Sequence, residues 1–375
     1  MARRKICVCG GGTEMGKIVF VIPDMPGGGT ERVVALLANE YSRRGIPTGI
    51  LLFAGSERAY PLDPRIEVVS VGGPSDGSLS VRIGRLRRMR QYYRENKNCQ
   101  IWAFSAMGTV FSAVAAFGQK HFFLVSERND PTRYDHRRIR DLCYRLAKVV
   151  VCQTEDAVKS FPTGIRKKSV VIPNPLEPKE EPYAGAREKR IVAVGRLNAQ
   201  KNHKLLLCAF AAFAKEHSGY VLELYGQGEQ EAELRALAGK LEIDGSVIFK
   251  GFSAHVLSDI RTASMYVLSS DYEGISNSML EAMALGLPVI ATDCPIGGSR
   301  MYIRDGVNGL LVPVGDAGAL AGAMGKLADD PAIGERLGAE AVKLREELAV
   351  SKIADRFLAL TAKGNGGKPQ GGNNE

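Results

Sequence analysis

The chain lacks any run of apolar residues long enough to cross a membrane. No stretch approaches the roughly 18 uninterrupted apolar residues that a spanning helix needs, and the apolar segment after Arg3 and Arg4 breaks into glycines too early for a signal peptide. The seven cysteines are scattered and odd in number, with only Cys7 and Cys9 close together, which speaks against a disulfide framework and favours reduced thiols. We therefore expect a protein of the cytoplasm or of a membrane surface.

Metal-ligand patterns and aromatic platforms are also missing. No Asp-x-Asp occurs, and the five histidines show no ligand spacing, so no metal and no other cofactor is predicted. The single tryptophan, Trp102, and the lack of an aromatic-rich basic strand argue against nucleic-acid binding. Residues 1–176 nevertheless carry 28 Lys+Arg against 15 Asp+Glu, whereas residues 177–375 carry 22 against 26. The basic half is expected to meet an anionic partner such as lipid headgroups or a diphosphate, although solubility alone accounts for part of the excess.

Short β-branched runs alternate with longer helical patterns along nearly the whole chain, the rhythm of βαβ units with parallel sheets. A Pro- and Glu-rich stretch at residues 173–189 reads as a linker. The sequence thus predicts an α/β protein of two Rossmann-like domains, residues 1–172 and 190–345. A helix over 346–362 is expected to pack back on the first domain, and residues 363–375 are expected to be disordered. The predicted strands are Ile18–Ile22, Gly49–Phe53, Ile66–Val71, Ile101–Phe104, Phe122–Ser126, Val149–Cys152, Val170–Ile172, Ile191–Gly195, Val221–Gly226, Val247–Gly251, Met265–Ser269, Val289–Thr292 and Leu310–Val312.

Residues Gly11 to Ile18 come within one residue of a phosphate-binding P-loop. Ile18 stands where a Ser or Thr hydroxyl must reach Mg²⁺, and a strand follows where a helix should open. ATP or GTP hydrolysis is therefore not predicted. Met15, just before the first strand, is a candidate for the native start in place of Met1.

A second glycine run, Gly27 to Thr30, does lie between a strand and a helix, the latter expected over Glu31 to Tyr41. Its backbone can approach a ligand closely. Arg32 occupies the position of the third glycine of a dinucleotide fingerprint, so a nicotinamide cofactor is not supported. The alternative is a tight βα turn with no ligand.

Two cations follow the first strand of the second domain. Arg196 ends that strand, and Lys201 precedes the next helix. Ligands of open α/β sheets sit outside the carboxyl ends of the strands, so this pair is expected to face a cleft and to suit the two phosphates of a nucleotide diphosphate. Two solvated surface cations are the alternative.

The segment SSDYEGISNSMLEAMALGLPVIATD carries two carboxylates in different settings. Glu273 is expected in a loop, and Glu281 on a helix that starts near Ser276 and ends at Gly286. Carboxylates accept hydrogen bonds from paired hydroxyls, so the two could hold a sugar ring and a ribose. The first amides of the helix would offer an anion site. Alternatively, Ser278 and Glu281 form a capping box, in which Glu281 only satisfies the backbone.

Together these motifs resemble the retaining GT-B glycosyltransferases of family 4, collinearly over about residues 17 to 345. The pieces are Gly195-Arg196-Leu197 with Lys201-Asn202, Gly226-Gln227-Gly228, Gly251-Phe252, Glu273 and Glu281 with seven residues between them, and Gly309-Leu310-Leu311-Val312.

The resemblance implies a metal-independent hexosyltransferase with two parallel-sheet domains facing a cleft. It implies that Arg196 and Lys201 bind the donor diphosphate, that Glu281 binds the ribose and Glu273 the transferred sugar, and that the leaving phosphate takes the acceptor's proton on the same face. The full set of expected donor-binding residues is Gly28, Gly29, Thr30, Gly226, Phe252, Gly274, Ile275, Ser276, Asn277 and Glu281.

One departure from the family concerns the acceptor side. Many relatives carry a histidine at the end of a first-domain strand, but here Phe122–Ser126 runs into Glu127 and Arg128. The forms SERNDP and CPIGGSRMYI resemble transferases that add N-acetylhexosamine or galactose from a UDP-sugar to bacterial surface polysaccharides or to glycans on polyprenyl diphosphate. Glu127 or Arg128 is expected to face the acceptor, with ordinary turn residues as the alternative.

A basic helix is predicted near residues 82–94. Arg87, Arg90 and Arg94 recur at helical spacing beside an apolar stripe, and the segment Arg133 to Arg145 repeats the theme with Ile139, Leu142 and Leu146. Such helices fit an anionic membrane or a lipid diphosphate, which predicts peripheral binding to the inner face of the cytoplasmic membrane. A core-packed helix with a solvated cationic back is the alternative.

A UDP-sugar epimerase or hydrolase of the same fold is the competing enzyme class, because fold does not settle function. Such enzymes need acid and base groups beside the sugar, and the low histidine content of the chain weakens that case.

Overall fold

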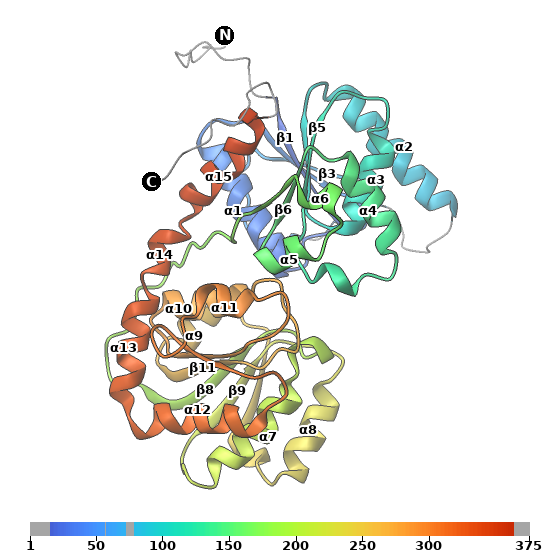
Figure 1. The fold of residues 1–375 in the computed structure, drawn as a ribbon. Coiled ribbons are helices and arrows are strands. Elements are labelled where there is room, and N and C mark those ends of the chain that lie inside the picture. The colour runs from blue at the N-terminus through green and yellow to red at the C-terminus, as the bar shows by residue number, and fades with distance from the viewer. Residues whose placement is uncertain (1–15, 57, 73–78, 364–375) are drawn as a thin grey trace.

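The computed structural model describes residues 16–56, 58–72 and 79–363, which form two α/β domains, one above the other in Figure 1. Most of the P-loop-like segment, the candidate start Met15 and residues 364–375 of the expected tail lie outside the described residues. Ile18 opens the first strand, as predicted, and Lys363 ends the last helix rather than belonging to the tail.

The N-terminal sheet is seven-stranded and parallel throughout, in the order β3-β2-β1-β4-β5-β6-β7. Phe20 of β1 lies opposite Ile50 of β2 and Trp102 of β4. Each predicted strand of this domain is confirmed to within one residue at either end. The strands are β1 Ile18–Ile22, β2 Thr48–Leu52, β3 Glu67–Ser70, β4 Gln100–Ala103, β5 Phe122–Ser126, β6 Val149–Cys152 and β7 Ser169–Val171.

Helices cover both faces of this sheet, because successive side chains of a strand point to opposite faces. Phe20 packs in the cluster that contains the apolar side of α1, whereas Val19 and Val21 pack in the cluster formed with α2 to α6. The helices are α1 Gly29–Arg43, α2 Leu79–Glu95, α3 Ala106–Ala115, the 3-10 helix η1 Pro131–Arg133, α4 Arg137–Leu146, α5 Glu155–Lys159 and α6 Thr163–Arg166.

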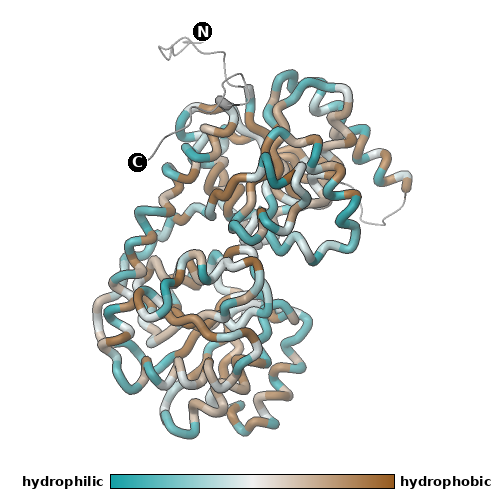
Figure 2. The backbone as a smooth tube through the Cα atoms, in the orientation of Figure 1, coloured by the Kyte–Doolittle hydropathy of each residue, from teal (hydrophilic) through white to brown (hydrophobic). Residues whose placement is uncertain are grey.

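The C-terminal sheet is six-stranded and also parallel, in the order β10-β9-β8-β11-β12-β13. The predicted strands are again confirmed, except that β8 starts three residues and β11 two residues earlier than expected. The start of β8 lies inside the segment assigned to the linker. Figure 2 shows the hydrophobic stretches in the interior of both domains. The strands are β8 Glu188–Val194, β9 Val221–Tyr225, β10 Val247–Gly251, β11 Ala263–Leu268, β12 Val289–Thr292 and β13 Leu310–Val312.

Two helical layers enclose the second sheet. One contains α7, α8 and α12, and the other contains α9, α10 and α11. The helices are η2 Ala199–Lys201, α7 His203–Ala214, α8 Glu231–Lys240, η3 Asp244–Ser246, α9 Val256–Ile260, α10 Asn277–Ala284, α11 Gly298–Tyr302, α12 Ala317–Asp329, α13 Pro331–Ala341, α14 Leu344–Glu347 and α15 Val350–Lys363. Among these and the other described helices, none has the length and apolar character to span a bilayer.

The last helix, α15, returns to the N-terminal domain (Figure 1). The ring of Phe357 stacks on Trp102 with centroids 5.6 Å apart, and the Tyr41 hydroxyl donates to the Ala354 carbonyl at 3.0 Å. Where the chain crosses between domains, the Leu176 amide donates to the Leu348 carbonyl at 2.7 Å. The two crossings therefore run side by side.

Each sheet reverses its winding direction once, between β1 and β4 in the first domain and between β8 and β11 in the second. Ligands of open α/β sheets bind at such switch points, outside the carboxyl ends of the strands. The glycine loop follows β1, and the loops with Lys201 and Glu273 follow β8 and β11. The sequence motifs thus lie where this architecture binds ligands.

Candidate functional site between the domains

Two loops of the C-terminal domain meet at its switch point. Lys201 Nζ lies 2.7 Å from Glu273 Oε1, and Ser270 Oγ donates to the same carboxylate oxygen at 2.9 Å. Glu273 is buried, and Lys201 is half-buried. Charged hydrogen bonds of this kind fix both side chains in place, so the carboxylate is oriented before any ligand binds.

Asn202, which follows Lys201, adopts a left-handed backbone conformation with φ of 44°. Its side-chain oxygen accepts from the Leu205 amide at 3.2 Å and caps α7, and its side-chain amide donates to Asp271 Oδ1 at 2.7 Å. Left-handed residues other than glycine are uncommon, with asparagine among the most tolerant. Asn202 thereby ties the loop after β8 to the loop after β11.

Gly226 is required by the packing of the loops. Its φ is +133°, and a Cβ at this position would lie 1.9 Å from the Gly195 carbonyl oxygen. No other residue fits where the ends of β8 and β9 approach so closely. Its expected contact with a donor stays a prediction.

Helix α10 is capped by Ser276, whose hydroxyl accepts from the Met279 amide at 3.4 Å. Ser278 instead donates to the Val194 carbonyl at 3.0 Å, and Glu281 Oε1 lies 2.7 Å from an Arg32 guanidinium nitrogen of the other domain. The capping-box alternative for Ser278 and Glu281 is therefore wrong. The Glu281 carboxylate faces the interface between the domains.

Glu281 is only 5% exposed. Burial raises the pKa of its carboxyl to about 7, against the lowering effect of the Arg32 guanidinium. A carboxyl that changes charge near neutral pH between two domains is typical of a functional site.

The glycine loop of the first domain meets the start of α10. The Asn277 side chain donates to the Gly29 carbonyl at 2.9 Å. Gly29 begins α1 and Asn277 begins α10, so the N-terminal ends of two helices come together, with Thr30 in the first turn of α1. Unpaired amides and the helix dipole make such ends favourable for anions.

The loop that carries Glu273 rests against the N-terminal domain. A Cβ on Gly274 would lie 2.1 Å from Gln153 Oε1 and 2.8 Å from the Arg128 carbonyl oxygen. Only glycine permits this approach, and the next residue, Ile275, is buried. Gly274 therefore contributes by its small size.

Arg196 and Phe252 remain accessible at the ends of β8 and β10. Burial raises the pKa of Glu31, and the charge of Arg196 opposes that rise across the interface. Phe252 is 67% exposed. An exposed aromatic ring can stack on a flat ligand, and the expected contact of Phe252 with a donor stays a prediction.

The Glu127 carboxylate turns into its own domain, and the expected contact of this residue with an acceptor stays a prediction. It is buried, and it accepts hydrogen bonds from the hydroxyls of Tyr134 at 2.9 Å and Tyr144 at 2.8 Å. Burial raises its pKa, against the opposing effect of those hydroxyls. Glu127 anchors the loop after β5 to α4.

Arg128 turns inward instead of toward open solvent. Its guanidinium donates to Asn174 Oδ1 and lies 5.4 Å from the centroid of the Phe104 ring. Burial lowers its pKa to about 10. Asn174 in turn donates to Asn277. Arg128 is thus a linking residue between the domains, and contact with an acceptor stays a prediction.

The three arginines of the predicted basic ridge lie on α2 and are all exposed, but they are not equivalent. Arg90 donates to the carbonyls of Ala115 at 3.1 Å and Phe117 at 2.8 Å, at the end of α3. Its charge therefore caps a helix end, which leaves Arg87 and Arg94 as the better candidates for an external anion.

Sequence reasoning missed Arg32. In the sequence it is notable only as the residue at the position of a fingerprint glycine, and its ion pair with Glu281 depends on the other domain. Its place in the first turn after a glycine loop was the available signal. The described part of the chain groups no three His, Cys, Asp or Glu side chains in an arrangement fit for a metal.

Comparisons with known proteins match both domains. The family described as Glycosyl transferases group 1 matches residues 178–344, and Glycosyltransferase Family 4 matches residues 27–180. An uncharacterized glycosyltransferase of Haemophilus influenzae is 24% identical over 92% of this chain and 100% of its own length.

Two further similarities cover nearly the full chain. The α-1,4-N-acetyl-D-galactosaminyltransferase of Campylobacter jejuni, named for a GalNAc-containing glycan on PP-undecaprenol, is 24% identical over 93% of this chain and 99% of its own. Anabaena HepE, solved in complex with UDP, superposes with a TM-score of 0.78 at 20% identity, covering 92% of this chain and 100% of the other. The chain belongs to the glycosyltransferases, with the GT-B fold and a C-terminal domain of the group 1 family.

Proposed function

We propose that this glycosyltransferase moves a hexose or N-acetylhexosamine from a UDP-sugar to a glycan on polyprenyl diphosphate, with retention of the anomeric configuration. The observation that carries the proposal is the position of Glu273 and Glu281 beside the joined starts of α1 and α10. The UDP bound to HepE and the acceptor in the name of the Campylobacter enzyme support the choice of substrates.

In this proposal the donor spans the two switch points. The diphosphate lies at the helix starts near Gly28 and Gly29, where Arg196 and Lys201 add positive charge. Glu281 accepts the ribose hydroxyls, so the ribose replaces Arg32 as its partner. Glu273, already oriented by Lys201 and Ser270, accepts hydroxyls of the transferred sugar.

The proposed reaction needs no separate protein base. The bond from the anomeric carbon to the leaving phosphate breaks as the acceptor oxygen attacks from the same face, and that phosphate takes the acceptor's proton. Arg196 and Lys201 stabilise the negative charge that develops on the phosphate, which is electrostatic catalysis by groups already in place. We propose that the charge is balanced without a metal ion.

The decisive experiment screens UDP- and GDP-sugars by calorimetry and then incubates the bound donor with a polyprenyl-diphosphate-linked glycan. Transfer, with an α-anomeric product from an α-linked donor by NMR, is the expected result. An epimerised donor, or a free sugar at equal rate with and without the acceptor, would identify an epimerase or a hydrolase instead.

We expect the affinity for UDP-glucose to fall as the pH drops below about 7. The Glu281 carboxyl has a pKa of about 7, so it is protonated and neutral below that pH, and a neutral carboxyl accepts hydrogen bonds from ribose less strongly. The ionised fraction falls about tenfold per pH unit there. UDP-glucose suits the measurement, because both of its phosphates are esterified and do not titrate near neutral pH.

Calorimetry between pH 5.5 and 8.5 measures the affinity for UDP-glucose. Two variants separate the titration of Glu281 from the titration of other groups. Glu281→Gln cannot ionise, so the pH dependence should vanish. Arg32→Gln leaves the buried carboxylate without its cation, so the midpoint should move to higher pH. The same pH profile in all three proteins would contradict the assignment of Glu281.

We also propose that the protein binds the cytoplasmic membrane peripherally, through its N-terminal domain. Apolar side chains of α4 and just after α3 are exposed, Leu142 by 63% and Phe117 by 74%. Exposed cations, among them Arg138 and Arg145, lie on α4 beside Leu142. Large exposed apolar groups among cations fit an anionic lipid surface. The alternative of a core-packed stripe is wrong for α4.

Replacing Phe117 and Leu142 by serine should lower binding to phosphatidylglycerol vesicles by at least about tenfold, because each inserted side chain contributes more than 1 kcal/mol. Vesicle sedimentation measures this partition. Ile248→Ser, at an exposed isoleucine of the C-terminal domain, is the matched control and should bind like the parent. An equal loss of vesicle binding in Ile248→Ser would contradict the assignment of the membrane-binding surface to α3 and α4.

A further inference from the structure

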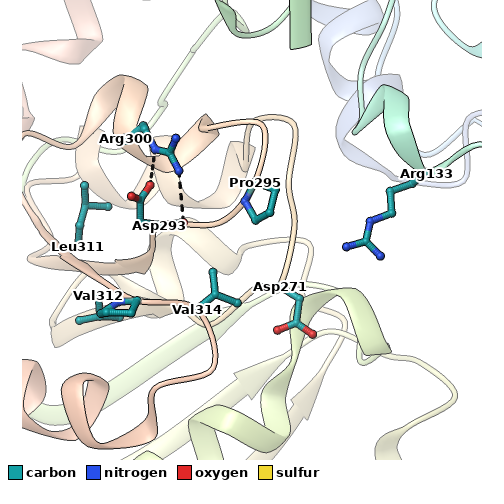
Figure 3. A pocket seen from close by; sticks show the side chains of 9 residues that line it. Arg133, Asp271, Asp293, Pro295, Arg300, Leu311, Val312 and Val314 are labelled. Carbon is teal, nitrogen blue, oxygen red and sulfur yellow. Dashed lines mark hydrogen bonds and ion pairs between the residues drawn. The ribbon is translucent and has the colours of Figure 1, made fainter. Parts of the chain in front are cut away.

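A hollow lies next to the loop that carries Glu273, on the side of β12 and β13. It encloses about 840 Å³ and is lined by residues of both domains. Figure 3 shows Arg133 reaching toward it from the N-terminal domain, opposite Asp271, while Arg300 and Asp293 pair with each other on the far side. Its size is within the range of about 300–1,000 Å³ usual for small-ligand sites.

The wall nearest Glu273 is held rigidly. The Asp271 amide donates to the Gln200 carbonyl at 2.9 Å, and Gln200 donates to the Tyr272 carbonyl at 3.1 Å. The guanidinium of Arg133 stacks on the Tyr272 ring at 4.3 Å from its centroid. The hollow therefore adjoins the loop that carries Glu273.

The charges of this hollow decide what it can hold. Two arginines, Arg133 and Arg300, are balanced by two aspartates, Asp271 and Asp293, and the remaining lining, including Pro295 and Val314, is apolar. Balanced charge disfavours a diphosphate or a nucleic acid, because both are anions that need a cationic surface. Carboxylates and guanidinium groups around an aliphatic surface instead suit the hydroxyls and the C–H face of a neutral sugar.

We propose that this hollow is the subsite for the terminal sugar of the acceptor glycan, an inference that rests on the proposed transferase function. The acceptor hydroxyl then enters from the β12–β13 side toward the transferred sugar at Glu273. The acceptor contact is thereby assigned to Arg133, Asp271 and Asp293, next to the loop that contains Glu127 and Arg128.

Saturation-transfer NMR tests the proposal with methyl α-galactoside and methyl N-acetyl-α-galactosaminide as probes, on protein saturated with UDP. We expect saturation transfer to at least one glycoside, and at least a fivefold reduction in Val314→Trp, which fills the hollow. Val307→Trp is the matched control, because Val307 is 42% exposed and Val314 39% exposed, and only Val314 lines the hollow. UDP binding measured by calorimetry should persist in both variants.

A second arm replaces UDP with a UDP-sugar that carries fluorine at C2 and cannot be transferred. Persistent glycoside binding supports an acceptor subsite, whereas loss of binding would show that the glycosides occupied the donor-sugar position and overturns the inference. An unchanged signal in Val314→Trp, or no glycoside binding to protein that binds UDP, also overturns it while leaving the proposed function intact. Failure of UDP to bind would instead remove the proposed function.

Discussion

Replacing Glu273 by glutamine is expected to lower kcat for sugar transfer by about 10²–10³-fold, the usual cost of losing one preorganised charged group at the reacting centre. Glutamine keeps the size of the side chain and can still contact Ser270 and Lys201, so the fold of the loop should survive. The substitution removes a negative charge that stabilises the positive charge developing on the transferred sugar in the transition state. Affinity for UDP alone should change less than threefold, because the contact with the sugar is absent there.

Glu223 supplies the matched control for this experiment. It is a buried glutamate of the same domain, paired with Arg190 at 2.7 Å. Glu223→Gln should lower thermal stability by breaking a buried ion pair and leave kcat within about twofold, whereas Glu273→Gln should lower kcat far more than stability. Steady-state turnover and thermal unfolding of both variants give the comparison. Unchanged turnover in Glu273→Gln would end the assignment of a sugar contact to this residue.

Replacing Glu281 by alanine is expected to weaken binding of UDP itself. A hydrogen bond to a charged group contributes about 1.5–3 kcal/mol, which corresponds to a loss of affinity between about tenfold and 150-fold. The partner left behind, Arg32, has 27% of its side chain exposed and can be hydrated. Large destabilisation is therefore not expected, and calorimetry at pH 8 can measure binding to folded protein.

Comparing the affinities for UDP and for inorganic diphosphate shows which part of UDP loses its contact in Glu281→Ala. Diphosphate has no ribose, so Glu281→Ala should bind it like the parent protein, while Lys201→Ala should weaken both ligands. Equal weakening of UDP and diphosphate in Glu281→Ala would show that the carboxylate acts on the phosphate site and not on the ribose.

The strands and the positions of the glycine loops were predictable because they depend on neighbours in the chain. The apolar run Ile18–Ile22 forms a buried strand of the predicted length, and Ser276 caps the helix expected after Glu273. Local periodicity determines such features, since a run buried on both faces and a capped amphipathic segment need no distant partner to be recognised.

Contacts between residues distant in the sequence could not be predicted in this way. Glu127 stands in a loop, which favoured a ligand role, yet Tyr144, on α4, draws it into the interior. Arg90 was grouped with its neighbours by helical spacing, although the end of α3 takes up its hydrogen bonds. Arg32 gains its significance from Glu281 of the other domain. Spacing predicts which residues share a face, and only the packed chain shows what that face meets.

The return of α15 also has a consequence for the synthesis of the protein. The core of the first domain includes Phe357, which stacks on Trp102 and lies 6.0 Å from Phe104 between ring centroids. A nascent chain emerges from its N-terminus, so this domain leaves the ribosome with one wall of its core missing. The second domain is complete first, and the first domain closes only when the final helix is released. The order of completion is thus the reverse of the order of synthesis.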